Sequence, residues 1–135
     1  MNSRGLRNCN PGNLRRTKDR WKGLRPIQTD KEFFQFVDMA HGYRAMMITL
    51  QNYVRRHGCR TMAGIIKRYA PPSENNTEAY IAAICEWTGI AADEVLDTRS
   101  RRDMVPIVVA MSRIENGLPA LRPQVEKGFD LTGWE

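Results

Sequence analysis

The sequence has few cysteines and few histidines, and their spacing argues against several classes of protein. Cys9, Cys59 and Cys85 are the three cysteines, and no CxxC pair is present. An odd number of widely spaced cysteines argues against a disulfide framework, a zinc ribbon and a redox motif. His41 and His57 are the only histidines, with no cysteine or second carboxylate at ligand spacing. We therefore expect neither a metal site nor a cofactor.

Long apolar stretches are also absent. The longest apolar run, residues 107–111, is far shorter than a membrane span. No apolar stretch follows the basic residues near the N-terminus, so we expect no signal peptide and no membrane insertion.

Glycine-rich phosphate loops and GxSxG motifs are missing, which leaves NTPase and serine hydrolase functions without support. These absences predict a protein that is cytoplasmic when it is made.

What is present is an ordinary globular composition with a basic balance. The 135 residues are 41% hydrophobic, and 21 Lys and Arg against 15 Asp and Glu give a net charge of +6. The length predicts a single domain, residues 1–135. Eight cations lie within residues 4–25. They form either a contact surface for phosphates or another anionic polymer, or a basic face exposed only to solvent. These cations are Arg4, Arg7, Arg15, Arg16, Lys18, Arg20, Lys22 and Arg25.

The chain changes character near Asp38. Before it, the sequence is turn-rich, and Asn-Pro-Gly-Asn at residues 10–13 is typical of a tight turn. Residues 13–16 and 33–37 are strand candidates, which predicts a small hairpin or a three-stranded ribbon. After Asp38, helical periodicity dominates. The fold class that we expect is α+β, mostly α.

Caps and breakers place the expected helices. Asp38 precedes an apolar stripe that ends near Gly58, and Thr61 precedes a second short stripe. Pro106 is expected in about the first turn of the most buried helix. The expected helices are 39–57, 62–69, one from the Asn75–Glu78 capping segment to Gly89, one from between Ser100 and Asp103 to Asn116, and 123–128, with a short helical turn at 93–96.

Glu115 is the first candidate for chemistry, because it comes at the end of the most apolar helix. The helix dipole and desolvation would both raise the pKa of a carboxyl there, as a general acid for a glycosidic bond requires. The alternative is an exposed glutamate beside a turn. Glu74 follows a double proline, and it either lines a groove or lies on the loop surface.

A helix-turn-helix is a further hypothesis for the region around Gly58, since two helices flank it closely. The second helix, however, has only Lys67 and Arg68 as long polar side chains, both at its C-terminal end. Recognition helices usually read bases from their N-terminal residues. The sequence therefore favours a DNA-binding module least, and nucleic acid is not an expected partner.

Several segments resemble a known family. Residues 4–15, RGLRNCNPGNLR, resemble the RGxRNxNPGNxR opening of small phage and prophage virion-associated proteins. WKGL at 21–24, FFQF at 33–36, HGYRA at 41–45 and YAPPSENNTEAYI at 69–81 resemble later segments of that family in the same order. The resemblance implies a muralytic, lysozyme-like helical domain with a small β-hairpin near the N-terminus.

The resemblance also implies site residues. In related glucosaminidases the catalytic glutamate ends a helix before an NNPxNI segment, whereas here nine residues precede Asn10. A circularly permuted domain would put the helix that ends near Glu115 in that position. The resemblance then implies Glu115 as general acid and base, Glu74 as the second catalytic candidate, Thr29 and Asp30 to position water, Asn10 and Asn13 in the glycan groove, and Trp21 and Tyr69 stacking on sugars.

The leading expectation is a peptidoglycan glycosidase of phage or prophage origin, of lysozyme or lytic transglycosylase type. It would cleave the glycan of N-acetylmuramic acid and N-acetylglucosamine with one glutamate as general acid and base. Its expected partners are bacterial peptidoglycan and phage virion proteins, and it would act at the cell wall after release or as part of a virion. The alternative is a virion structural protein without catalytic activity.

Overall fold

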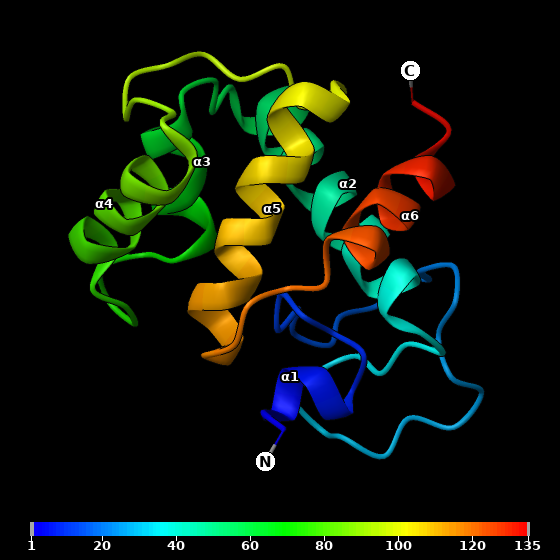
Figure 1. Ribbon diagram of the computed structural model, residues 1–135. Helices are drawn as coiled ribbons and strands as arrows, with labels where there is room; N and C mark the ends of the chain where they lie inside the picture. The colour runs from blue at the N-terminus through cyan, green and yellow to red at the C-terminus, as the bar shows by residue number, and fades with distance from the viewer. Residues whose placement is uncertain (1, 135) are drawn as a thin grey trace.

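The computed structural model describes residues 2–134, and helices are the only regular elements in that range. Helix α5 lies in the middle of the molecule, with α3 and α4 on one side and α2 and α6 on the other (Figure 1). The helices are α1 (Arg4–Arg7), α2 (Met39–His57), α3 (Met62–Tyr69), α4 (Thr77–Thr88), α5 (Arg101–Asn116) and α6 (Arg122–Thr132).

The prediction of an α+β fold with a β-hairpin is wrong, because the structure is all-α. The strand candidates at 13–16 and 33–37 form no strand, and the N-terminal region is paired only at isolated bridges, Arg15 with Phe33 and Leu24 with Phe36. We call residues 8–37 the N-terminal segment. It runs as an irregular chain beside α2 in Figure 1.

Polar side chains take the backbone groups that a hairpin would have paired. The side chain of Asn10 accepts from the Leu14 N–H at 2.9 Å and donates to the Leu14 and Phe34 carbonyls at 3.0 Å each. The Gln28 side chain likewise binds both the N–H and the carbonyl of Gln35. Because buried backbone groups need one partner each, these bonds substitute for a ladder.

Helices α2, α3 and α4 begin and end where the sequence predicts. At each N-terminus a side-chain oxygen of Asp38, Thr61 or Asn76 accepts a hydrogen bond from a first-turn N–H. Gly58 and Gly89 follow α2 and α4 in the left-handed conformation, with φ of 66° and 76°. These three predictions are confirmed.

The predicted bounds of helix α5 are confirmed, while its proline lies slightly deeper in the helix than expected. It begins at Arg101, so Pro106 lies in the second turn and not in the first. The missing N–H of Pro106 leaves the Arg102 carbonyl without a helical partner. Arg102 is exposed, so water can bind that carbonyl instead.

The predicted helical turn at residues 93–96 and the predicted end of the last helix are wrong. Residues 93–96 form no helix, since Val95 pairs with Thr61 at an isolated bridge. Helix α6 does not end at Gly128 but continues to Thr132. Gly128 faces α2, where a Cβ would lie 3.0 Å from the Ala40 carbonyl, so this glycine allows close helix packing.

Two apolar clusters hold the molecule together. The larger lies between the helices and includes the fully buried Met46, Leu50 and Ile107. The smaller contains Phe34, Phe36 and Ala45, and it attaches the N-terminal segment to α2.

Gly42 allows the N-terminal segment to lie against α2. A Cβ at Gly42 would lie only 2.1 Å from the Cys9 carbonyl oxygen and 2.6 Å from Pro11 Cδ. The absence of a side chain therefore lets the backbone of the segment approach the helix directly. Within residues 2–134, no helix has both the length and the hydropathy needed to cross a bilayer.

Candidate functional site

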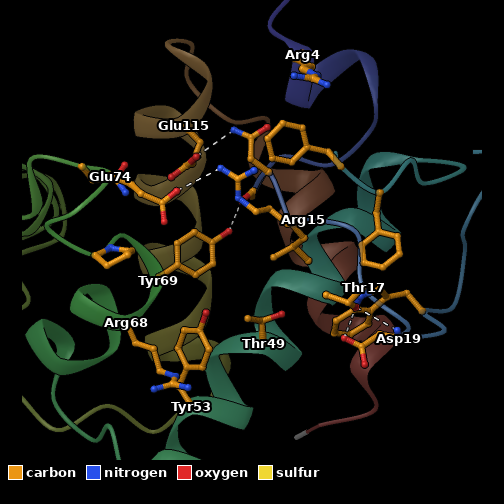
Figure 2. Close-up of a pocket in the computed structure, with 18 residues that line it drawn as sticks. Arg4, Arg15, Thr17, Asp19, Thr49, Tyr53, Arg68, Tyr69, Glu74 and Glu115 are labelled. Carbon is orange, nitrogen blue, oxygen red and sulfur yellow. Dashed lines mark hydrogen bonds and ion pairs between the residues drawn. The ribbon is translucent and has the colours of Figure 1, made fainter. Parts of the chain in front are cut away.

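A groove of about 640 Å³ lies where the N-terminal segment faces the helices. One wall consists of Arg4 with residues 12–15, 17, 19, 21 and 33–34, and the other of residues from α2, α3, the 71–75 loop and the end of α5. Figure 2 shows Glu115 at one end of the groove, Tyr69 in the middle, and Tyr53 with Arg68 at the other end. The volume falls in the range of ligand-binding clefts.

The Glu115 carboxyl is held by two donors. One oxygen accepts from Asn13 Nδ2 and the other from the Tyr80 hydroxyl, each at 3.0 Å. Burial raises the pKa of Glu115 above its ordinary value, while the hydrogen bonds from Asn13 and Tyr80 act in the opposite direction. Burial, and then the nearby Glu115, also raise the pKa of the Tyr80 hydroxyl, so Tyr80 keeps its proton and donates. The arrangement presents a partly buried carboxyl that takes up a proton more readily than a free glutamate.

Asn13 reaches Glu115 because the turn at residues 10–13 is fastened on two sides. The Asn116 amide, one residue after Glu115, donates to the Pro11 carbonyl at 2.9 Å. The Tyr69 hydroxyl, from the end of α3, donates to the Gly12 carbonyl. Asn13 itself has φ of 50°, a left-handed conformation that asparagine tolerates better than most residues.

The groove has further carboxylates opposite and beyond Glu115. The Glu74 carboxylate forms an ion pair at 3.3 Å with Arg15, which extends toward it from the N-terminal segment (Figure 2). Asp19 lies on the N-terminal side and accepts from the Thr17 hydroxyl at 2.8 Å. The groove therefore offers two exposed carboxylates in addition to the partly buried one.

The predicted site residues divide into two groups. Five of them line the groove, namely Glu115, Glu74, Asn13, Trp21 and Tyr69. The other three, Asn10, Thr29 and Asp30, do not line it.

The three residues outside the groove have structural partners. Asn10 is fully buried and holds the Leu14 and Phe34 backbone. The Thr29 N–H and hydroxyl both donate to Gln35 Oε1, at 2.6 and 3.1 Å.

Asp30 is held by a charged partner and by amides. Arg4 forms an ion pair with its carboxylate at 2.7 Å, and Asn8 Nδ2 donates at 2.9 Å. These bonds, that from Arg4 first, hold the pKa of Asp30 well below its ordinary range. Asp30 thus organises the N-terminal segment.

Several residues that line the groove were not predicted from the sequence. Tyr53 belongs to the apolar stripe of α2, and Arg68 lies in the last turn of α3, where a basic residue suits the helix dipole. Thr49 and Asp19 carry no local signal. Among residues 2–134, no three His, Cys, Asp or Glu side chains gather as a metal site requires.

The chain is similar to a known phage protein. Protein P5 of Pseudoalteromonas phage PM2 is 35% identical to it over 132 residues, which cover 95% of this chain and 81% of that protein. No protein-family model matches the chain.

Proposed function

This chain belongs to the family of protein P5 of phage PM2, and from that premise we propose that it is a phage-type peptidoglycan glycosidase. Glu115 is the general acid in this proposal, and the groove receives the glycan. Glu74 and Asp19 are the further carboxylates within the groove. None of these roles depends on a β-hairpin.

One observation carries the proposal, namely the state of Glu115. Its carboxyl lines a groove, is half-buried, and has a pKa raised by that burial. A general acid must hold its proton near the working pH and release it to the leaving oxygen, and burial produces this property in glycosidases. Asn13 and Tyr80 fix the orientation of the carboxyl without neutralising it through a cation.

The proposed reaction begins with proton transfer from Glu115 to the oxygen that links N-acetylmuramic acid to N-acetylglucosamine. The bond from that oxygen to the muramic acid C1 breaks, and the N-acetylglucosamine end leaves with the proton. Water then adds to C1 and returns a proton to Glu115, or the sugar's own 6-hydroxyl adds to C1, gives its proton to Glu115 and forms an anhydro ring. Glu74 is the second candidate for activating the water.

The groove walls suit a sugar chain. Trp21, Tyr53 and Tyr69 supply aromatic surface along the groove, on which sugar rings can pack. The protein carries a net charge of +6, which favours approach to an anionic cell wall. These features support a glycan better than a small apolar ligand.

The test is release of muropeptides from purified sacculi, followed by mass spectrometry. Glu115→Gln preserves the size of the side chain and removes the transferable proton, so we expect a loss of rate of at least ~100-fold. Glu86→Gln, an exposed change on α4 away from the groove, is the matched control and should keep the native rate. The end groups then distinguish hydrolysis from anhydro-ring formation.

The other outcomes are equally informative. No release by the native protein would overturn the glycosidase proposal. Equal release by the native protein and Glu115→Gln would keep the enzyme but remove Glu115 from the mechanism, and Glu74→Gln would then be the next variant.

The second candidate is a phage virion structural protein without catalysis, and the family relationship favours it. Both oxygens of Glu115 already have partners, which join α5 to α4 and to the N-terminal segment. Such a carboxyl can serve as a structural tie. A virion role predicts that the protein purifies with particles and that Glu115→Gln changes stability alone.

A further inference from the structure

The groove extends beyond the end that faces away from Glu115. A second hollow of about 590 Å³ shares Tyr53, Arg68 and Pro71 with the groove and adds Gly64 and Lys67. These shared residues therefore form the boundary between two neighbouring hollows. A ligand longer than the groove would pass over them.

Arg68 differs from the other two arginines that line the groove. Arg4 has Asp30 and Glu32 as ion-pair partners at 2.7 and 3.0 Å, and Arg15 has Glu74 at 3.3 Å. Within residues 2–134, no carboxylate lies within ion-pair distance of Arg68.

Arg68 contacts a histidine and an aromatic ring. Its guanidinium lies 5.5 Å from the centre of the Tyr53 ring and 3.0 Å from His57 Nε2. Arg68 and the neighbouring Lys67 are both exposed. A planar guanidinium stacked on an aromatic ring is held in place while its remaining donors stay available to an anion.

The charges along the groove are therefore arranged unequally. Arg4 and Arg15 lie toward the Glu115 end and are ion-paired with carboxylates, whereas Arg68 lies toward the other end (Figure 2) and is followed by Lys67 in the second hollow. Arginine binds carboxylates through paired hydrogen bonds in a specific geometry. Arg68 would thus select which of two alternating sugars lies beside it when only one of them carries a carboxylate.

We propose that Arg68, supported by Lys67 and Tyr53, forms a subsite for a carboxylate borne by the N-acetylmuramic acid unit of the glycan. This inference rests on the proposed function. The carboxylate is either that of the lactyl group or that of an attached peptide. Arg68 is a specificity-determining residue in this proposal and takes no part in proton transfer.

The experiment measures binding in the Glu115→Gln background, so that the glycan stays intact. Three probes share a β-1,4-linked backbone: chitohexaose has no carboxylate, amidase-stripped glycan strands carry lactyl carboxylates, and intact strands carry peptide carboxylates. Adding Arg68→Gln should weaken binding of at least one carboxylate-bearing probe about tenfold and change chitohexaose binding less than twofold. Loss on stripped strands assigns the lactyl group, and loss on intact strands alone assigns the peptide.

Two further variants separate recognition from folding. Arg68→Lys keeps the charge and should retain most of the binding that Arg68→Gln loses. Arg56→Gln removes an exposed charge outside both hollows and should leave binding of all three probes unchanged. Thermal unfolding of each variant reports whether the last turn of α3 depends on Arg68.

Equal weakening of all three probes by Arg68→Gln, or no weakening, would overturn the subsite. No binding of any probe by the Glu115→Gln protein would overturn it as well. The proposed function is tested separately by muropeptide release from the native protein. A releasing enzyme with an indifferent Arg68 therefore disproves only the subsite.

Discussion

Residues 39–132 and the N-terminal segment reach a defined structure by different means. The helices bury a large, continuous set of aliphatic, methionine and aromatic side chains, whereas the segment has a small apolar cluster and many bonds between side chains and backbone. Burial of apolar area is non-directional and tolerates substitution by similar residues. Hydrogen bonds are directional, so the segment depends on particular side chains at particular positions. The groove lies where these two regions meet.

The largest loss of stability is expected from a cavity in the helical region. Ile107 is fully buried in the centre of α5, so Ile107→Ala should lower the free energy of unfolding by about 2–5 kcal/mol. Urea denaturation measures it, with Val109→Ala, a partly buried position on the same helix, as the comparison. If Ile107→Ala lost less stability than the variants of the N-terminal segment described below, apolar burial in the helices would not be the larger source of stability.

A clash at the junction of the two regions should come next. Gly42→Ala places a Cβ against the Cys9 carbonyl and should cost about 3 kcal/mol, since backbone must move. Gly64→Ala on α3 meets only the Thr61 hydroxyl at 3.1 Å and should be nearly neutral, because alanine also favours helix. Hydrogen exchange should show faster opening of residues 8–37 in Gly42→Ala alone, and uniform opening of the whole molecule would show that the segment is not a separate unit.

Asn10→Ala tests the directional bonds of the segment. It leaves the Phe34 carbonyl and the Leu14 N–H without a partner, while the Leu14 carbonyl keeps only the Phe34 N–H, at a cost of about 2 kcal/mol. Asn75→Ala, at an exposed position, is the control and should stay within about 0.5 kcal/mol. Limited proteolysis should find new cleavage sites within residues 8–37 of Asn10→Ala, and an unchanged pattern would show that the bonds of Asn10 are dispensable.

The pH dependence of stability tests the burial of Glu115. A carboxyl whose pKa is raised in the folded state stabilises the protein below its ordinary pKa of 4.5, and this contribution is lost as pH rises through the folded-state pKa. Glu115→Gln cannot ionise. As the pH rises from about 4.5 to 8, the free energy of unfolding of the variant should therefore increase relative to that of the native protein. Unfolding free energies at the two pH values measure the difference. A difference that does not change with pH would show that Glu115 ionises as freely in the folded protein as in the unfolded chain.

The smallest effect is expected from the exposed ion pair between Arg15 and Glu74. Arg15→Gln should change the free energy of unfolding by less than about 1 kcal/mol, because water screens the pair. The measurement is urea denaturation at low and high salt, where the native protein and the variant should converge as salt rises. A large difference that persists in high salt would mean that the pair holds the groove walls together.

The same difference between the helices and the N-terminal segment decides which elements could be predicted from the sequence. Caps and periodicity placed α2, α3 and α4, because a cap and an apolar stripe are local signals. In the N-terminal segment, the sequence instead predicts short strands at 13–16 and 33–37. Its structure depends on distant polar partners, such as Gln35 bonded to Asn8 over 27 positions, which leave no local pattern.

For the candidate site, the sequence singled out Glu115 from its place at a helix end but could not show what surrounds it. Asn13 and Tyr80 lie 102 and 35 positions away from it in the chain. In the sequence, Arg68 is explained as a cation at a helix end, and Tyr53 as an aromatic residue of the core. Their position on one groove follows only from the packing of α2 against α3.

The bond between Asn13 and Glu115 has a consequence for synthesis of the protein. The two residues are 102 positions apart, and a ribosome that adds about 5–20 residues per second needs roughly 5–20 s to make that stretch. Throughout this interval the turn at residues 10–13 lacks the end of α5, which fastens it through Asn116. The groove therefore forms late in the life of the nascent chain, and whatever it binds cannot be bound while α5 is still in the ribosome.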